Sequence, residues 1–247
     1  MQTALLHHTQ PDASVPLRNQ VLMIDADDTL WENNIFFEQA IDRFIAMVAH
    51  PELSPQEVRS ALDRLEAVRV KSHGYGTEAF HASLLASFEH LTGTACNAEQ
   101  AHHVAACAGH IRSSDMVLLH GVAETLVHLA KTHTLLLVTK GDHAEQTAKL
   151  LRSNLADHFT HVEVLREKHT SAYRALLDHY GFDPARTWMI GNSPRSDINP
   201  ALAAGMHAVY LPHHSTWVLE QEPIAPPPPG RRFLHLLSFT DLLHHFA

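Results

Sequence analysis

The sequence VLMIDADDTLW at residues 21–31 decides the fold. Residues 21–24 are a short apolar run, which is typical of a strand buried on both faces of a parallel sheet. Three carboxylates follow within four positions, at Asp25, Asp27 and Asp28. Like charges this close destabilise a fold unless a cation neutralises them, and their oxygens are ligands that suit Mg²⁺. The alternative interpretation is a helix start with an acidic first turn.

Apolar runs of the same kind recur along the chain, with helical patterns between them. The expected strands are residues 21–24, 135–138, 161–165, 188–190, 208–211 and 233–236. The expected helices are residues 123–131, 143–155, 171–180 and 200–204, with a last helix that starts at residues 240–241. Strands that alternate with helices indicate βαβ units. The sequence therefore predicts an α/β fold with a Rossmann-like parallel-sheet core.

Residues 33–115 interrupt this alternation. They are rich in Ala, Leu, Glu and His, and they lack strand-like runs. Apolar residues between positions 36 and 48 fall on one helical face, and turns are expected at residues 50–51, 74–76 and 92–94. We therefore predict a helical insert at 33–115 in a core made of residues 1–32 and 116–247. Residues 223–230, PIAPPPPG, are predicted to form a stiff extended linker before the last strand.

Composition limits the partners of the protein. The chain has 247 residues, with 27 Asp and Glu against 18 Lys and Arg, and a formal net charge of −9. It has no basic run, so we expect no nucleic-acid polymer as a partner. No stretch approaches the ~20 apolar residues of a membrane span. The first residues lack the basic and apolar regions of a signal peptide, so we expect a cytoplasmic protein that binds no membrane.

The 21–31 segment resembles motif I, hhhhDxDxT, of the haloacid dehalogenase (HAD) superfamily of hydrolases, and three further motifs follow in order. Residues 137–142, LVTKGD, resemble motif II, a strand that ends in a phosphate-binding Thr or Ser. Lys168 is placed like the lysine of motif III, and residues 189–198, MIGNSPRSDI, resemble motif IV, GDxxxxD. The matches span residues 21–211. They imply a HAD-like phosphatase in which residues 33–115 form a helical C1-type cap.

The resemblance implies a role for each matched residue. Asp25 would be the nucleophile that forms an aspartyl-phosphate, and Asp27 would be the general acid and base. Thr139 would bind a phosphoryl oxygen, and Lys168 would balance the negative charge. Mg²⁺, the implied cofactor, would be held by Asp25, the backbone carbonyl of Asp27 and the motif IV residues Asn192 and Asp197.

Three positions depart from the usual pattern of the family. Asn192 replaces the first aspartate of motif IV, and its amide oxygen still suits Mg²⁺. Which of Asn192 and Asp197 binds the metal directly stays open at this point. Lys140 replaces the commoner asparagine after Thr139, so it either contacts the phosphate of the substrate or points to solvent. Asp28 replaces a frequent glycine, which we interpret as tolerated.

The turn at residues 74–76 lies in the middle of the predicted cap. We expect it to reach the phosphoryl site, with Tyr75, Lys71 or His73 in contact with the substrate. The alternative is an ordinary turn between two helices. The glycine spacing also matches a dinucleotide fingerprint, but a helix precedes it where that motif needs a strand.

A second metal site is conceivable on the sequence alone. His103, Cys107 and His110 are spaced to share one helical face and could hold Zn²⁺ with a fourth ligand. The chain contains 23 histidines, so coincidence also accounts for this spacing.

Asp27 decides between the reactions of the family, because haloacid dehalogenases lack that second acid and need no metal. The sequence therefore predicts a Mg²⁺-dependent phosphomonoester hydrolase that acts on a small phosphorylated metabolite. The alternatives are a phosphotransferase or mutase, a dehalogenase, or a weakly catalytic binding or regulatory module, which the exchange at Asn192 would favour.

Overall fold

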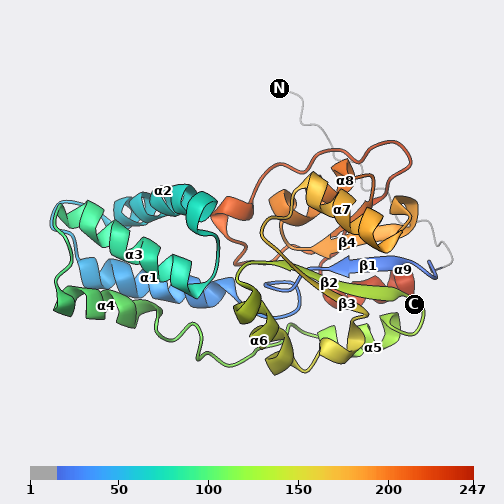
Figure 1. Ribbon diagram of the computed structural model, residues 1–247, viewed down its shortest axis with the longest axis horizontal. Helices are drawn as coiled ribbons and strands as arrows, with labels where there is room; N and C mark the ends of the chain where they lie inside the picture. The colour runs from blue at the N-terminus through green and yellow to red at the C-terminus, as the bar shows by residue number, and fades with distance from the viewer. Residues whose placement is uncertain (1–15) are drawn as a thin grey trace.

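The computed structural model of the chain describes residues 16–247 (Figure 1). Residues 1–15, which open the predicted core and in which we expect no signal peptide, lie outside the described residues. Within the described range, no helix combines the length and the apolar character that crossing a membrane requires.

A six-stranded sheet forms one half of the molecule, and all of its neighbouring strands run parallel. The strands are β1 (Val21–Ile24), β2 (Thr134–Lys140), β3 (His161–Leu165), β4 (Thr187–Gly191), β5 (His207–Tyr210) and β6 (Phe233–His235). Their order in the sheet is β3-β2-β1-β4-β5-β6. This confirms the predicted α/β fold, and every strand starts and ends within two residues of its expected limits.

The helices follow the predicted alternation. They are α1 (Asn34–Val48), α2 (Pro55–His73), α3 (Thr77–Thr92), α4 (Ala98–Ala108), α5 (Val122–Leu129), α6 (His143–Ser153), α7 (Thr170–Tyr180), α8 (Asn199–Ala203) and α9 (Leu243–Phe246). A 3₁₀ turn, Phe239–Leu242, leads directly into α9, so the last expected helix is made of two short pieces. Residues 223–230 contain neither helix nor strand, as expected for an extended linker.

Both faces of the sheet are covered by helices. Leu22 and Ile24 of β1 pack in a cluster with buried residues of α5, α6 and α9. Met23 points to the other face and packs against α7 and α8. Side chains alternate between the two faces along a strand, so every residue of β1 meets an apolar layer. Figure 1 shows α7 and α8 on one side of the sheet and α5 and α6 on the other.

Helices α1–α4 form a block beside the sheet with an apolar core of its own (Figure 1). Each helix contributes a fully buried residue to this core: Phe44 from α1, Leu62 from α2, Leu84 from α3 and Val104 from α4. Helices α2 and α4 both begin with a capping box, in which the side chains of the N-cap and N3 residues bind each other's backbone amides. The turn at residues 74–76 joins α2 to α3, as predicted.

The strand order creates a switch point beside β1. The chain goes from β1 to β2 and β3 on one side, and then returns to β4 on the other side of β1. In open parallel sheets, ligands bind at the carboxyl ends of the strands at such a point. Asp25 directly follows β1, and Asn192 directly follows β4. The fold therefore places these two predicted site residues side by side.

Candidate active site

A cavity of about 150 Å³ lies between the carboxyl ends of the strands and the helical block. All of the predicted site residues line it: Asp25, Asp27, Tyr75, Thr139, Lys140, Lys168, Asn192 and Asp197. A cavity of this volume has room for a molecule of about the size of benzene. The space therefore fits a small substrate.

The floor of the cavity is a buried group of one lysine and two carboxylates. Lys168 Nζ donates hydrogen bonds to an oxygen of Asp25 and, at 2.8 Å, to Asp197 Oδ1. Burial raises the pKa of Asp25 to about 7; Lys168 opposes this rise, whereas the charge of Asp197 adds to it. Two buried carboxylates this close need a shared cation, because an unpaired buried charge is strongly destabilising. Lys168 is that cation.

Asp197 is held by a π-helical turn, Pro194–Ile198, that follows β4. The backbone amides of Asp197 and Ile198 both donate to Ser193 O, at 2.9 and 3.1 Å. The amide of Ser193 in turn donates to Asp197 Oδ2 at 3.0 Å. A Cβ atom at Gly191 would lie 2.2 Å from the same oxygen, so only glycine leaves room for this side chain. Isolated π turns are frequent at functional sites, and sequence reasoning did not predict this one.

The donor set at the ends of β1 and β4 fits Mg²⁺. The Thr29 hydroxyl donates to Asp25 Oδ2 at 3.1 Å and lies 3.5 Å from Asn192 Oδ1. The Asn192 amide nitrogen donates to Thr216 Oγ1 at 3.3 Å, which turns the amide oxygen toward Asp25. Carboxylate and amide oxygens are the ligands that this cation prefers. Asp25, Asn192 and Asp197 all line the cavity and supply such oxygens to it.

Asp27 lies in a cradle of donors that sequence reasoning missed. It accepts hydrogen bonds from the Trp31 indole at 2.7 Å, from Gln146 at 2.8 Å and from Lys149 at 3.0 Å. Burial acts to raise the pKa of Asp27, but the charge of Lys149 and these hydrogen bonds outweigh it, so the pKa is lowered. Gln146 and Lys149 are three residues apart on α6 and share a face, which is the signal that the sequence carries for them.

Asp28 has a structural role that the sequence did not reveal. Its φ of 60° is in the left-handed region, which glycine adopts freely and aspartate adopts more readily than most residues. Its carboxylate accepts hydrogen bonds from the amides of Asn33 at 2.9 Å and Asn34 at 3.1 Å. Asp28 therefore caps the start of α1 and ties the helical block to the end of β1.

Lys140 is paired rather than directed to solvent. Its Nζ forms an ion pair with Glu220, donates to Ser196 Oγ at 2.9 Å and lies 4.3 Å from the centre of the Tyr75 ring. Glu220 also accepts a hydrogen bond from Ser193 at 2.6 Å. The lysine therefore links the π turn and the 74–76 turn at one end of the cavity.

The 74–76 turn is attached to the core on both sides. Tyr75 donates a hydrogen bond to Glu167 at 2.6 Å, and its ring meets the Trp217 ring edge to face. The amide and hydroxyl of Thr77 donate to the Glu145 carboxylate at 3.0 and 3.1 Å. Of the three residues expected to reach the substrate, Tyr75 lines the cavity. Lys71 and His73 are exposed at the end of α2 and do not line it, so Tyr75 is the one of the three alternatives that the structure places at the cavity.

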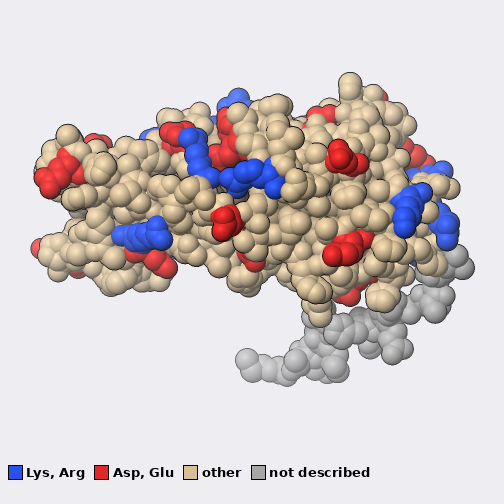
Figure 2. Space-filling model, turned by 90° about the horizontal axis from the view of Figure 1, so that it is seen from below, with Lys and Arg blue, Asp and Glu red and all other residues tan. Residues whose placement is uncertain are grey.

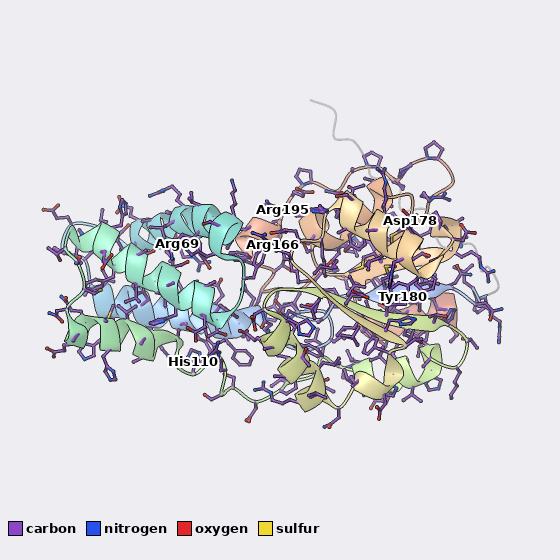
Figure 3. The ribbon with its side chains drawn as sticks, viewed as in Figure 1. Arg69, His110, Arg166, Asp178, Tyr180 and Arg195 are labelled. Carbon is purple, nitrogen blue, oxygen red and sulfur yellow. The ribbon has the colours of Figure 1, made fainter. Side chains whose placement is uncertain are left out.

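The conceivable zinc site does not form. Helix α4 ends at Ala108, so His110 lies beyond the helical face that it was expected to share (Figure 3). His110 Nδ1 lies 2.8 Å from Arg43, and Cys107 is buried in the core of the helical block. Between residues 16 and 247, three ligand atoms come within 4.8 Å of one another at Glu32, His213 and His214 instead.

Charged groups on the outer surface show no single dominant sign on the face that Figure 2 presents. Basic and acidic side chains occur there as small separate clusters, without a continuous basic stripe. The cavity differs from that face, because seven carboxylates and three lysines contribute to its walls.

Similar structures have been solved. A haloacid dehalogenase-like family hydrolase from Xanthomonas campestris is 26% identical, with 91% of this chain and 92% of that chain covered and a TM-score of 0.76. A predicted phosphoglycolate phosphatase from Haemophilus somnus is 19% identical, with 91% and 96% covered and a TM-score of 0.60. The L-2-haloacid dehalogenase from Xanthobacter autotrophicus is 14% identical, with the same coverage and TM-score. The last two show only that the fold is shared. No curated protein matches the chain.

A family model described as haloacid dehalogenase-like hydrolase matches residues 20–205. The matched region begins just before β1 and extends beyond α8, so it includes Asp25, Thr139, Lys168 and Asp197. The match covers well over half of the sequence. The chain therefore belongs to the haloacid dehalogenase-like hydrolase family.

Proposed function

We propose that this hydrolase cleaves phosphomonoesters of small metabolites, with Mg²⁺ as cofactor and an aspartyl-phosphate on Asp25 as intermediate. The observation that supports this most is that Asp27 lines the same cavity as Asp25. An ester oxygen that leaves phosphorus needs a proton, which a second carboxylic acid can supply. A halide leaves without a proton, so a dehalogenase has no use for that acid.

The proposed reaction has two steps. In the first, an Asp25 oxygen bonds to phosphorus, the bond from phosphorus to the ester oxygen breaks, and Asp27 gives its proton to that oxygen. In the second, a water molecule attacks phosphorus, Asp27 takes a proton from it, and Asp25 leaves as a carboxylate together with inorganic phosphate. Hydrogen bonds from Trp31, Gln146 and Lys149 favour the carboxylate form of Asp27, which the second step requires. They oppose the protonated form that the first step uses, so Asp27 must gain its proton against its lowered pKa before the ester oxygen leaves.

Other residues would hold the phosphoryl group and balance its charge. Thr139, which is buried at the end of β2, would bind a phosphoryl oxygen through its hydroxyl and backbone amide. Lys168 would keep Asp25 ionised and oriented, since it already bonds to that carboxylate. Mg²⁺ would be held by Asp25, the Asp27 carbonyl, Asn192 and Asp197. The bound ion would supply positive charge to the phosphoryl oxygens.

We further propose that residues 33–115 act as a cap over a core of residues 1–32 and 116–247. Phe37 of α1 and Phe80 of α3 line the cavity, and so does Tyr75 in the turn between α2 and α3. A wall of this kind excludes bulk water and limits the size of the substrate. Tyr75 and Lys140 would contact the substrate where the cap meets the core.

The test is hydrolysis of p-nitrophenyl phosphate and of propyl phosphate, measured with Mg²⁺ and with EDTA. We expect turnover that requires Mg²⁺ and falls by ~10³-fold or more in Asp25→Asn, because the nucleophile is lost. Asp178→Asn is the matched control, because Asp178 is exposed on α7, away from the cavity (Figure 3). Both proteins should keep the same far-ultraviolet circular dichroism.

The alternatives give different results in the same experiment. Halide release from a 2-haloacid in EDTA, without phosphate release, would indicate a dehalogenase. Transfer of the phosphoryl group to an added alcohol in preference to water would indicate a phosphotransferase. Binding of the ester without turnover by the unmodified chain would contradict the proposed hydrolysis and favour a binding module.

A further inference from the structure

Glu66 of α2 lies in the cavity wall without a bonding partner. Glu66 is only 6% exposed, and it lines the cavity. Among the residues that the structure describes, nothing is within hydrogen-bond distance of Glu66 Oε2. The other six carboxylates that line the cavity each accept at least one hydrogen bond. Glu66 is the exception, and it belongs to the helical block rather than to the sheet side of the cavity.

Apolar side chains of the helical block line the cavity together with Glu66. They are Phe37 and Ile41 of α1, Val70 of α2 and Phe80 of α3. Val70 is four residues from Glu66 and shares its face of α2. A carboxylate buried among such side chains is destabilising unless it finds a partner.

The fold supplies a cation nearby, but that cation is already used. Arg59 donates to both oxygens of Glu38, at 2.5 and 2.9 Å, and to Asp63 at 2.8 Å. Burial raises the pKa of Glu66 to about 7; Asp63 and Glu38 add to the rise, and Arg59 opposes it. A cation that enters the cavity from outside would therefore favour the ionised form of Glu66.

The charge of the cavity selects the sign of the ligand. Its walls carry seven carboxylates against three lysines, and no arginine side chain belongs to the described lining. A phosphate dianion and one Mg²⁺ cancel each other, so they leave the excess of carboxyl groups in place. Burial raises the pKa of Asp25, Asp28 and Glu66 to about 7, so part of this excess is neutral near pH 7 and is ionised more readily beside a cation. A positive group on the organic part of the substrate reduces the excess, whereas a carboxylate group would add to it.

We infer that Glu66 binds a cationic nitrogen, so that the substrates are small phosphomonoesters whose alcohol part carries an ammonium group. The phosphoryl group would lie at Asp25 and Lys168, and the carbon chain would pass along Phe37, Ile41 and Phe80. The ammonium group would end at Glu66. This inference rests on the proposed phosphomonoesterase function and specifies its substrate class.

Two esters of equal size test the inference. 2-Aminoethyl phosphate and propyl phosphate have the same number of heavy atoms and differ by an ammonium group in place of a methyl group. We expect wild-type protein to prefer the amino ester by about tenfold to a hundredfold in kcat/KM, which is typical of a hydrogen bond between charged groups. In Glu66→Gln the preference should fall at least about tenfold, mainly through KM. Turnover of propyl phosphate should stay within about twofold, because its methyl group has no charge to pair.

Glu99→Gln is the matched control, because Glu99 is exposed on α4 and does not line the cavity. It should keep the preference for the amino ester. Propyl phosphate turnover shows in the same assay that Glu66→Gln is folded. Equal use of both esters by the wild-type protein, or a preference that survives in Glu66→Gln, would overturn the inference.

Binding gives an answer that does not depend on turnover. Calorimetry with Asp25→Asn measures the Kd of both esters without reaction. Tighter binding of the amino ester, lost in the Asp25→Asn, Glu66→Gln double variant, would support the Glu66 site even if the chain hydrolysed neither ester. Equal Kd values for the two esters would reject the site while leaving the phosphatase proposal intact.

Discussion

The two sides of the cavity differ in whether their buried carboxylates are paired with a cation. On the side of the sheet, Asp25 and Asp197 share Lys168, and Asp27 is paired with Lys149. On the side of the helical block, Glu66 is buried without a partner for its Oε2 atom. The charges of the paired side are compensated within the protein, whereas Glu66 would find a partner only in a ligand. The comparison suggests that the reaction resides in the core and the choice of substrate resides in the helices.

The difference follows from how each side is built. The core side is assembled from the ends of β1, β2 and β4, which the parallel sheet brings together whatever the nearby sequence. Charges from several segments can therefore be placed against one another. The helical side is a wall of α1, α2 and α3, whose apolar faces pack on each other and leave few positions that face the cavity. A single change of residue at such a position alters the ligand and leaves the reacting groups in place.

The largest effect on activity is expected for Gly191→Ala, which should disturb the sheet side of the cavity and leave the Glu66 side unchanged. The added Cβ would lie 2.2 Å from Asp197 Oδ2, so Asp197 must shift away from Lys168 and from the proposed metal position. We expect kcat to fall by about tenfold to a hundredfold, as for the loss of one preorganised charge contact. The Mg²⁺ concentration for half-maximal rate should rise. The ratio of kcat/KM for amino and alkyl esters should stay unchanged, because Glu66 is untouched.

Gly109→Ala is the control for that variant. Gly109 follows α4, has no positive φ, and a Cβ there would meet atoms no closer than 3.6 Å. A Gly191→Ala protein with wild-type kcat and Mg²⁺ dependence would show that Asp197 does not need its present position. A change in the preference between the esters would show that the two sides are coupled.

Sequence reasoning located the core side well, for a physical reason. Asp25, Thr139 and Asn192 each follow or end an apolar strand, and parallel strands carry their carboxyl ends to one edge. A short apolar run that stops at polar residues is a local signal, so the strands and their terminal residues can be found without tertiary information. The exact strand limits moved by one or two residues, because hydrogen bonding with neighbours decides where a strand ends.

The helical side and the cradle of Asp27 could not be found in this way. Glu66 lies in α2 among many charged residues, and nothing in the sequence distinguishes it from those that face water. Gln146 and Lys149 look like ordinary solvent-facing positions of an amphipathic helix until α6 is placed against β1. The π turn that holds Asp197 depends on space left by Gly191, which is a tertiary contact. Each of these features depends on distant segments.

Tyr75→Ala tests the junction between the two sides, with an intermediate effect. The variant loses the hydrogen bond to Glu167, the contact with the Trp217 ring and the stacking of Lys140 on the Tyr75 ring. We expect KM to rise about fivefold to tenfold with kcat changed less, because the wall that encloses the substrate loosens. Tyr75→Phe keeps the ring contacts and should raise KM by about twofold. Steady-state kinetics with propyl phosphate measures both. Unchanged kcat/KM in Tyr75→Ala would reduce the 74–76 turn to a simple connection between helices.

The smallest expected effect is on stability at acid pH, and it depends on two buried histidines of the core, His133 and His207. In the core, His133 Nδ1 accepts from the amide of Gln20 at 3.1 Å, and its Nε2 is 2.6 Å from the carbonyl of Phe246. His207 is held in the same manner, by the amide of Arg232 and the carbonyl of Ala185. A second ring proton would displace the amide donor. Burial, the largest cause, lowers the pKa of both rings below the ordinary value of 6.5.

Because the unfolded chain binds these two protons at a higher pH than the folded chain does, the two rings lower the free energy of unfolding as the pH decreases below about 6.5. The carboxyl groups whose pKa burial raises to about 7, Asp25, Asp28 and Glu66, act in the opposite direction, so the contribution of a ring is the difference between its variant and the wild type. Urea unfolding from pH 8 to 5.5 measures the slope, and His133→Gln should make it shallower, since glutamine can accept and donate the same bonds without titrating. His103→Gln, an exposed change in the helical block, is the matched control and should leave the slope as it is. An identical slope in wild type and His133→Gln would show that acid acts elsewhere, and a shallower slope in His103→Gln would place the acid-sensitive part in the helices rather than in the core.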